Sequence, residues 1–304
     1  MKAAVYTKTK SGKTLQIMDV ETPIPKDNEV LIKTRAASVN PLDWRLKSQR
    51  PGVDLAGEVV AVGKRVTQFK PGDAVFGACR GAFAEYARTS EAALVSKPVN
   101  LTFEQAAGVP IAGLTALQGL RDKGDLQPGQ KVLINGASGG IGTFAVQIAK
   151  SLGAEVTGVC STRNVEMVRS LGADLVIDYT QEDFTNNGRY YDLVLDNVGN
   201  RTLSAFRRVM TPRGRCVMAG APKQLWAVVT RVLKALAWSA FLRQKFTFFI
   251  AKLKKDDLGA LCELMKTGKV TPLIDKRYRL SDTADAIAYV EQGHARAKVV
   301  VSFE

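Results

Sequence analysis

A glycine-rich turn between an apolar strand and a helical stretch has the residue types and spacing to bind phosphate. The run 131–142 reads KVLINGASGGIG, and apolar residues then recur at helical spacing until Gly153. Backbone N–H groups at such a helix start can bind the pyrophosphate of a dinucleotide. Ala137, Gly139 and Gly142 occupy the three fingerprint positions, and we expect the alanine to relax the tight turn. The residues expected to contact the phosphates are Ser138, Gly139, Gly140, Ile141 and Gly142.

The strand that ends at Cys160 indicates which dinucleotide is bound. An NAD-specific site has Asp or Glu at this position, where the carboxylate holds the ribose hydroxyls. Here no carboxylate is present to repel a 2′-phosphate, and Ser161, Thr162 and Arg163 follow Cys160. Because a charge-assisted hydrogen bond contributes about 1.5–3 kcal/mol, these residues favour NADPH. In the alternative interpretation, Arg163 is a solvated residue in the first turn of a short helix over 164–171.

The cysteine and histidine content gives little support to metal or disulfide chemistry. The four cysteines, Cys79, Cys160, Cys216 and Cys262, are far apart in the sequence, and His294 is the single histidine. We expect reduced, mostly buried thiols, as in a cytosolic protein. The chain starts without the apolar run of a signal peptide, and no stretch approaches the length of a membrane span. These observations predict a cytoplasmic protein.

The periodicity of apolar residues changes along the 304-residue chain. Short apolar runs separated by Gly and Pro predict an irregular barrel up to about residue 107. A helix is expected over 105–120. After it, strands alternate with helices, which predicts a parallel sheet covered by helices. The expected strands are 132–135, 156–160, 175–177, 193–195 and 216–219, followed by helices over 260–265 and 284–291 and a last strand over 298–302.

Several motifs together resemble the medium-chain dehydrogenase/reductase superfamily, in its zinc-free quinone oxidoreductase (zeta-crystallin-like) branch. The motifs are 37–43, 51–59, 69–77, 113–118, 135–142, 196–199 and 293–299. The resemblance implies an α/β protein with a GroES-like β-barrel catalytic domain and a Rossmann parallel-sheet domain that binds NADPH. We place the catalytic domain at 1–107 and 253–304 and the Rossmann domain at 108–252. In the family the active site lies between the two domains.

Two positions indicate why the zinc-free branch fits. The zinc-dependent relatives have a cysteine where this chain has Asn40 and a histidine where it has Val53. Neither residue supplies the thiolate or imidazole that a catalytic zinc needs. The resemblance therefore implies hydride transfer from NADPH to a quinone or an α,β-unsaturated carbonyl. Hydrogen-bond donors that stabilise the negative charge developing on the substrate oxygen contribute roughly 3–4 kcal/mol.

The resemblance also assigns roles to single residues. It implies that Asn40 and Thr115 lie near the nicotinamide as catalytic residues. The further cofactor residues that it implies are Tyr179, Asn197, Val198, Gly220 and Lys298. Alternatives stay open: Asn40 shapes a turn before Pro41, Thr115 bonds to its own helix, and Tyr179 is an ordinary aromatic at a strand end. We expect Asp43, which also matches a family position, to be structural.

Two departures from the family pattern affect the substrate side. The segment 45–50 is shorter than in relatives, which predicts a more open pocket. Ala297 replaces a glycine that is common in the terminal motif. We expect cofactor binding to survive both changes.

The segment 222–255 has eight Lys or Arg and no Asp or Glu, within a net charge of +14. One interpretation is a helix followed by a strand over 246–250 at the edge of a homodimer, as in relatives. Its apolar helical face comprises Trp226, Val229, Leu233, Leu236 and Ala240. The other interpretation is an interfacial helix that inserts Trp238 and Phe241 into an anionic membrane. No RNA-binding motif is present, so nucleic acid is a poor candidate partner.

Two hypotheses on function follow. The first is an NADPH-dependent reductase of small quinones or activated alkenes. The second is an NADPH-binding protein with little turnover, whose basic segment binds a membrane or nucleic acid. The charge of segment 222–255 and the short segment 45–50 favour the second, and the family motifs favour the first.

Overall fold

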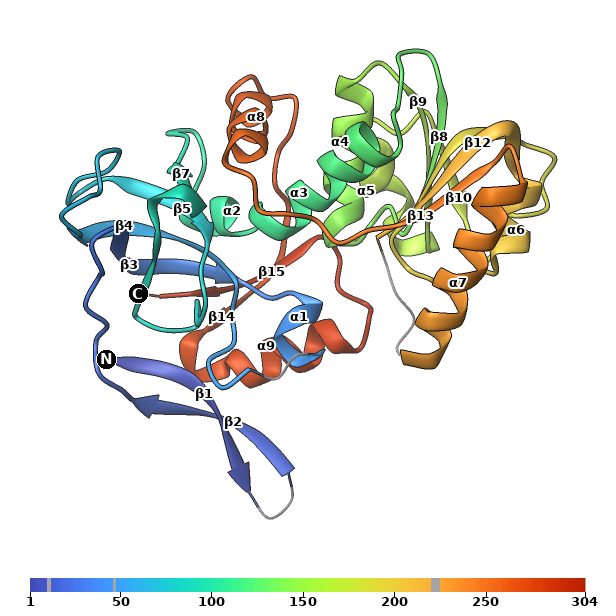
Figure 1. The fold of residues 1–304 in the computed structure, drawn as a ribbon. Helices are drawn as coiled ribbons and strands as arrows, with labels where there is room; N and C mark the ends of the chain where they lie inside the picture. Colours follow the sequence, from blue (N-terminus) through green and yellow to red (C-terminus); the bar gives the residue numbers. More distant parts are fainter. Residues whose placement is uncertain (10–11, 46–47, 220–224, 304) are drawn as a thin grey trace. The chain divides into compact units, whose positions relative to one another are not determined.

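The computed structural model describes residues 1–9, 12–45, 48–219 and 225–303 (Figure 1). These residues form two compact units. The first unit comprises Met1–Leu114, Leu253–Gly268 and Pro272–Glu304, and the second comprises Thr115–Lys252 and Lys269–Thr271. Among the described residues, no helix is long and apolar enough to cross a membrane.

The first unit is built on a mostly antiparallel seven-stranded sheet in the order β14-β15-β3-β4-β5-β7, with β6 paired to β3. Its strands are β3 (Glu29–Ser38), β4 (Asp54–Val62), β5 (Ala74–Ala78), β6 (Tyr86–Ser90), β7 (Leu94–Ser96), β14 (Ile274–Arg279) and β15 (Lys298–Ser302). A separate hairpin is formed by β1 (Lys2–Thr9) and β2 (Gly12–Asp19). The last strand of the chain, β15, pairs with β3, so residues from both ends of the sequence meet in one sheet.

The described helices that lie wholly within this unit are α1 (Pro41–Arg45), α2 (Phe103–Ala107), α8 (Lys255–Lys266) and α9 (Thr283–Glu291). The helix predicted over 105–120 is interrupted. A capping box between Thr102 and Gln105 starts α2, which ends at Ala107, and α3 (Pro110–Gln118) follows. Pro110 lacks an N–H and disfavours helical geometry in the residue before it, which explains the break. A π-helical turn, Gly119–Lys123, follows α3.

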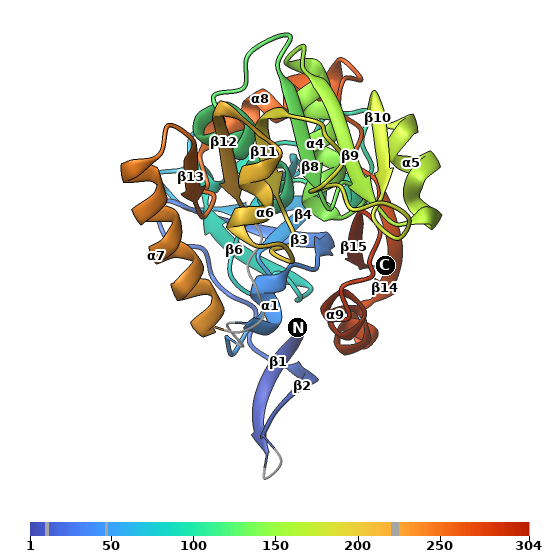
Figure 2. The ribbon, with the colours of Figure 1, turned by 90° about the vertical axis from the view of Figure 1, so that its right-hand side faces the viewer.

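The second unit contains a six-stranded parallel sheet in the order β10-β9-β8-β11-β12-β13. Its strands are β8 (Lys131–Asn135), β9 (Glu155–Cys160), β10 (Leu175–Asp178), β11 (Tyr191–Asp196), β12 (Met210–Met218) and β13 (Lys245–Phe248). Its helices are α4 (Gly140–Ser151), α5 (Val165–Ser170), α6 (Leu203–Arg208) and α7 (Leu225–Phe241). Figure 2 shows α5 beside β10 and α7 beside β13, at opposite ends of the sheet. The α/β fold class predicted from the sequence is confirmed.

The central strands of this sheet are apolar because both of their faces are covered. Val132, Leu133 and Ile134 in β8 have no exposed surface, as expected for a strand buried on both sides. The strand order reverses direction between β8 and β11, which lie side by side. In open parallel sheets, ligands bind at the carboxyl ends of the strands at such a switch point.

Candidate active site

The glycine-rich turn follows β8 and leads into α4. The residue of this turn with a left-handed backbone is Gly136, whose φ is +79°; Ala137, which follows it, does not have a positive φ. Ala137 is fully buried, and its backbone N–H donates to the carbonyl oxygen of Val159 at 2.9 Å. The expectation that Ala137 relaxes the turn is therefore wrong, because Gly136 makes the turn and Ala137 joins it to β9.

The fold itself requires glycine at one position of the turn, Gly142, but not at another, Gly139. A Cβ atom on Gly142 would lie 2.1 Å from the Gly136 carbonyl oxygen, so the fold itself requires glycine there. A Cβ atom on Gly139 would meet only that same oxygen, at 3.5 Å, and the φ of −83° suits any residue. The fold leaves the space over Gly139 open at the N-terminus of α4, where a phosphate group can approach the backbone. The turn therefore fits a dinucleotide.

A buried amide joins this turn to the end of β9. The side chain of Asn164 is 4% exposed, and its Nδ2 donates to Ser138 Oγ at 3.1 Å and Ser161 Oγ at 3.2 Å. Two residues predicted to contact the cofactor are thereby held together by one that sequence reasoning missed. Thr162 and Arg163 lie beside them in the short 3₁₀ turn Thr162–Asn164 and are exposed.

The neighbouring strand supplies a carboxylate that the sequence analysis did not anticipate. Asp178, the last residue of β10, is in register with Cys160. Its Oδ2 accepts a hydrogen bond from Thr162 Oγ1 at 2.5 Å, and its Oδ1 accepts one from Thr180 Oγ1 at 2.7 Å. The bond from Thr162 lowers the pKa of the Asp178 carboxyl. The expectation that no carboxylate lies near this position is therefore corrected.

A second turn lies beside the first, at the end of β11. The fully buried Asp196 accepts hydrogen bonds from Asn135 Nδ2 at 2.8 Å and from the N–H groups of Val198 and Gly199. These bonds fix the turn 196–199. A Cβ atom on Gly136 would lie 2.6 Å from Val198 Cγ2, so the turns after β8 and β11 are in contact.

Asn197, in this second turn, has a buried side chain with unused hydrogen-bonding capacity. Neither its Nδ2 nor its Oδ1 has a partner within the described ranges. Buried amides are nearly always paired, so this arrangement suits a bound molecule with one donor and one acceptor. The role along the ribose and ring of the nicotinamide that the family resemblance implies for Asn197 stays a prediction.

Two further predicted residues, Tyr179 and Thr115, can be placed individually, and a third cannot. Tyr179 follows β10, is 49% exposed, and donates its N–H to the Cys160 carbonyl oxygen at 3.0 Å. Thr115 lies in α3 and is buried. Gly220 lies outside the described residues.

In the first unit, a buried polar cluster brings together residues from β15, from β4 and from the short loop between β3 and α1. Lys298 Nζ, on β15, donates to Asn40 Oδ1 at 2.8 Å and lies 3.9 Å from Asp54 Oδ2. Asn40 Nδ2 donates to the same Asp54 oxygen at 2.9 Å. All three side chains are almost completely buried. Two of them, Asn40 and Lys298, were predicted site residues, and the structure brings them into direct contact.

Asp54 connects this cluster to further elements. Its carboxylate also accepts hydrogen bonds from Ser38 Oγ at 2.9 Å and from the Ile111 N–H at 3.1 Å, in the first turn of α3. Burial raises the pKa of Asp54 and lowers the pKa of Lys298, while their mutual attraction opposes both shifts. Because its pKa is lowered, a buried lysine of this kind loses its proton more readily than a solvated one.

Asp43 positions the loop that carries Asn40. Its carboxylate accepts hydrogen bonds from the N–H groups of Asn40 at 2.7 Å and Gly52 at 3.0 Å. Burial raises the pKa of Asp43 to about 7. The contacts of Asp43 are with the backbone, as expected for a structural residue.

The described residues contain no group of three or more His, Cys, Asp or Glu side chains that could hold a metal ion. The four cysteines are buried, and none of them forms a disulfide in the described part of the chain. At the position where zinc-dependent relatives have a cysteine ligand, Asn40 instead binds the ammonium group of Lys298.

The fold and the site define a two-domain oxidoreductase, and comparison with known proteins identifies the family. Residues 26–99 match the alcohol dehydrogenase GroES-like domain, and residues 171–301 match the zinc-binding dehydrogenase family. The chain is 35% identical over 313 residues to a chloroplast envelope quinone oxidoreductase homolog of Arabidopsis thaliana, covering 94% of this chain and 93% of that protein. An NADPH-dependent alkenal/one oxidoreductase of the same plant is 33% identical and covers 99% of this chain, which covers 79% of that protein.

Solved structures give the same result. The quinone oxidoreductase from Coxiella burnetii is 28% identical, with a TM-score of 0.87, covering 100% of this chain and 99% of that one. The chain therefore belongs to the medium-chain dehydrogenase/reductase superfamily, among its quinone oxidoreductases. It is an oxidoreductase of a family that binds a nicotinamide cofactor. The predicted family and the predicted GroES-like and Rossmann-like parts are confirmed.

Proposed function

We propose that this protein is a zinc-independent, NADPH-dependent reductase of quinones or α,β-unsaturated carbonyls. The observation that carries the proposal is the space that the fold leaves open over Gly139, at the N-terminus of α4. Beside this space, Asn164 links Ser138 of the glycine-rich turn to Ser161 at the end of β9. In the proposed arrangement, residues 1–107 and 253–304 act as the catalytic domain and residues 108–252 as the cofactor domain.

The residues of the second unit have distinct proposed roles in binding. The N–H groups of the turn from Ser138 to Gly142 hold the pyrophosphate. Ser161 and Arg163 hold the 2′-phosphate, which a guanidinium binds well. Asn197 satisfies its unpaired amide on the nicotinamide side. When bound, the cofactor supplies the hydride. The remaining proposed contacts are Thr162, Tyr179, Val198 and Gly220.

Asn40 and Lys298 of the first unit are the proposed donors toward the reaction, and Thr115, in the part of α3 that belongs to the second unit, is the third. The Asn40 amide is oriented by Asp54 and Lys298. Lys298 holds a proton at Nζ in a site where burial lowers its pKa. Donors that are fixed before the reaction stabilise developing negative charge more effectively than solvent does.

The zinc-independent part of the proposal rests on charge. The ammonium group 2.8 Å from Asn40 Oδ1 places a positive charge at the position of a zinc ligand in relatives. A divalent cation there would be repelled by it, and the amide offers no thiolate. Elemental analysis of the purified protein tests this: a stoichiometric zinc ion would contradict the proposal.

A substrate panel tests the activity. NADPH oxidation is followed by the loss of nicotinamide absorbance with a range of quinones, enones and enals, and with NADH in parallel. We expect turnover with at least one of these classes and a preference for NADPH. Tight NADPH binding with near-zero turnover across the panel would instead favour the second hypothesis, a cofactor-binding protein. The NADPH-dependent relative from Arabidopsis supports including enals and enones.

We further propose a homodimer and a cytoplasmic location. β13 is the last strand of the sheet in the described part of the second unit, so its outer edge can pair with a second copy. Light scattering coupled to size-exclusion chromatography checks the mass, and a monomer at micromolar concentration would contradict the dimer. Fractionation of the source cells tests the location.

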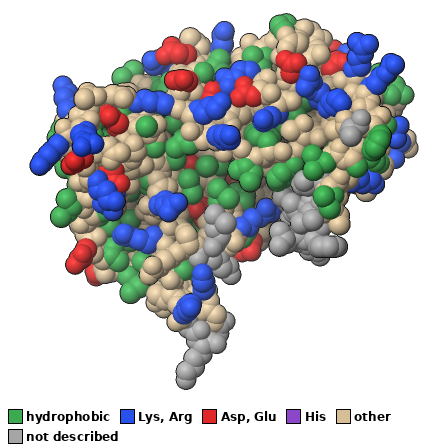
Figure 3. Space-filling view, in the orientation of Figure 1, with side chains coloured by type: hydrophobic (Ala, Val, Ile, Leu, Met, Phe, Trp, Pro, Cys, Tyr) green, Lys and Arg blue, Asp and Glu red, His purple; other side chains and the backbone are tan. Residues whose placement is uncertain are grey.

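Among its described side chains, the face of the protein drawn in Figure 3 shows no continuous basic patch of the kind that binds nucleic acid. Lys and Arg side chains are spread across this face and are interspersed with Asp and Glu. Nucleic acid stays a poor candidate partner because the sequence contains no RNA-binding motif.

A further inference from the structure

The reductase function leaves the basic segment 222–255 unexplained. The segment has eight Lys or Arg and no Asp or Glu. Its described part contains α7 and β13, both in the second unit. Two faces of α7 differ sharply in what they contact.

The inner face of α7 packs on β13. Ala235 is 2% exposed, and the ring of Trp238 meets the ring of Phe246 edge-on, with 5.5 Å between the centroids. Ser239 Oγ accepts from the Phe246 N–H at 2.8 Å and donates to its carbonyl oxygen at 3.0 Å. The expectation that Trp238 inserts into a membrane is therefore wrong, because this side chain packs against β13.

The outer face of α7 exposes large apolar side chains. Leu233 is 61% exposed, Leu236 is 63% exposed and Phe241 is 89% exposed. Their positions in the sequence put them on one side of the helix, within an arc opposite Ala235. The side chains of Trp226, Val229 and Ala240, which were predicted for an apolar face, lie outside the described residues.

Exposed cations occur in the same segment of the chain as these apolar side chains. Lys234, Arg243, Lys245 and Lys252 are exposed. Lys234 Nζ lies 4.7 Å from the centre of the Trp238 ring, and Lys245 Nζ donates to the Ser239 carbonyl oxygen at 2.8 Å. A helix that combines an exposed apolar face with Lys and Arg and lacks acidic residues has the composition of an interfacial helix.

Charge decides between the candidate partners. A second copy bound symmetrically through the outer face of α7 would bring two helices of the same sign together with no acid on either. The homodimer proposed above uses the edge of β13 and not this face. An anionic lipid surface instead offers phosphate groups for the cations and acyl chains for the leucines and the phenylalanine.

We propose that the outer face of α7 binds the surface of an anionic lipid bilayer, with Leu233, Leu236 and Phe241 inserted among the lipids. The contact is peripheral, since no helix in the described ranges meets the requirements of a membrane span. This contact involves none of the proposed cofactor residues. The test of membrane binding and the test of reductase activity can therefore give independent results.

Vesicle sedimentation with the full-length protein tests the proposal. The probes are phosphatidylcholine vesicles with and without phosphatidylglycerol, at low ionic strength and at about 0.5 M salt, where electrostatic screening acts within a few ångströms. We expect the protein to pellet with the mixed vesicles at low salt, less at high salt, and little with phosphatidylcholine alone. Absence of pelleting with mixed vesicles at low salt would overturn the proposal.

Two sets of variants locate the contact. Leu233→Ser combined with Leu236→Ser should weaken binding to mixed vesicles by about tenfold or more, since burying each leucine is worth more than a factor of ten. Arg243→Gln combined with Lys252→Gln should weaken it by about fivefold for each cation removed.

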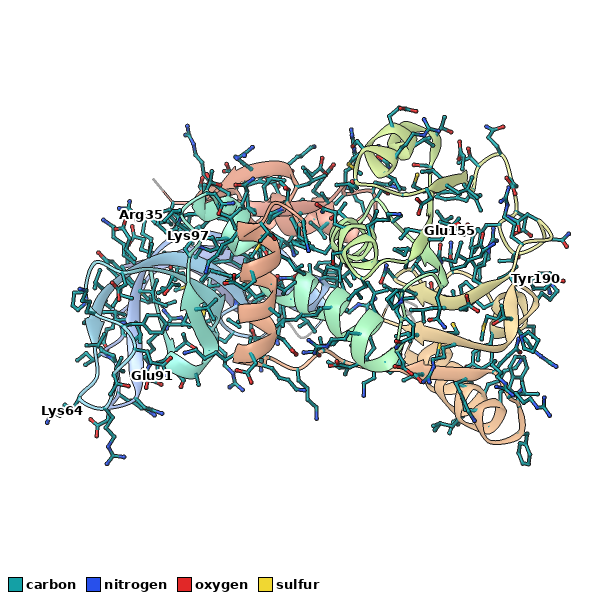
Figure 4. The ribbon with its side chains drawn as sticks, turned by 90° about the horizontal axis from the view of Figure 1, so that it is seen from above. Arg35, Lys64, Glu91, Lys97, Glu155 and Tyr190 are labelled. Carbon is teal, nitrogen blue, oxygen red and sulfur yellow. The ribbon has the colours of Figure 1, made fainter. Side chains whose placement is uncertain are left out.

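Matched controls come from the first unit. Ile24→Ser and Val99→Ser alter side chains that are 82% and 99% exposed, and Lys64→Gln removes an exposed cation on the turn after β4 (Figure 4). Thermal melting and NADPH binding confirm that each variant is folded. Equal loss of vesicle binding in the controls and in the α7 variants would overturn the assignment to α7.

Two other outcomes would also overturn it. If the leucine variant turned a dimer into a monomer and the parent protein did not bind vesicles, the partner would be a second copy. If the parent protein bound an RNA or DNA oligomer but no vesicle, the segment would be a nucleic-acid surface.

Discussion

The ammonium group of Lys298 donates a hydrogen bond to the side-chain oxygen of Asn40, 2.8 Å away, although the two residues are 258 positions apart in the sequence. The pairing of β15 with β3 makes this contact possible. Asp54, from β4, completes the cluster and balances the charge of the lysine. The polar centre of the first unit therefore depends on the return of the chain's last strand.

Replacing Lys298 tests this dependence. Lys298→Met would leave the Asp54 carboxylate buried without its cation, which is expected to lower the free energy of unfolding by about 3–5 kcal/mol. The double variant Lys298→Met/Asp54→Asn removes both charges and should be less destabilised than the single variant. Urea unfolding measures both, with Lys269→Met, at an exposed position, as the control. A single variant as stable as the parent would contradict the ion pair.

Arg163→Ala tests the cofactor preference. Loss of the proposed contact with the 2′-phosphate should weaken NADPH binding about tenfold or more and leave NADH binding nearly unchanged. Fluorescence titration with each cofactor gives the two dissociation constants. Arg169→Ala is a suitable control, since Arg169 is also exposed and pairs with Glu166 on α5. Equal loss for both cofactors would show that Arg163 does not recognise the 2′-phosphate.

Asp178→Asn should strengthen NADPH binding, in contrast to Arg163→Ala, which should weaken it. The carboxylate adds negative charge beside Ser161–Arg163 and accepts the hydrogen bond that the Thr162 hydroxyl donates. Removing the charge should strengthen NADPH binding by up to about fivefold, with little change for NADH. Asp183→Asn serves as the control, because Asp183 accepts from Thr185 in a similar turn. Stronger binding of both cofactors to the same degree would refute this role.

Ala297→Gly should stabilise the protein. Ala297 has φ of +55°, a left-handed conformation that disfavours any residue with a Cβ atom, and family members commonly have glycine in this motif. Relief of this strain is worth about 1 kcal/mol and should raise the melting temperature by about 2–4 °C. Ala288→Gly, at an exposed position in α9, is expected to lower it instead. A lower melting temperature for both variants would contradict the strain argument.

The parallel sheet and the glycine-rich turn could be predicted because local sequence determines them. The apolar runs of β8 and β9 are buried on both faces, and Gly153 ends the helical pattern after β8. The expected strands of the sheet were found, although β13 ends at Phe248, two residues before the predicted end. By contrast, β14 has the sequence IDKRYR, in which alternation with charged residues conceals an edge strand.

The contacts of the site could not be predicted because they join distant parts of the sequence. Asn164 reaches Ser138, and Asp178 reaches Thr162, only through the register of neighbouring strands. Asp178 could have been found, since it ends β10 as Cys160 ends β9 and the carboxyl ends of parallel strands meet at one edge. No comparable sequence pattern indicated Asn164.

Asp43 gives the stability of the first unit a specific dependence on pH. Its carboxyl has a pKa of about 7 in the folded protein, raised by burial from the 3.8 expected in the unfolded chain. Between about pH 4 and pH 7 the folded state therefore holds a proton that the unfolded state has released, so its contribution to stability falls as the pH rises through this range, by up to about 4 kcal/mol. In Asp43→Asn the free energy of unfolding should fall less steeply over the same range, with some slope left because burial also raises the pKa of Asp54. Urea unfolding at several pH values measures both slopes, with the exposed Asp19→Asn as the control. Identical slopes in the parent and in Asp43→Asn would show that this carboxyl is already ionised at low pH and that its two backbone hydrogen bonds outweigh its burial.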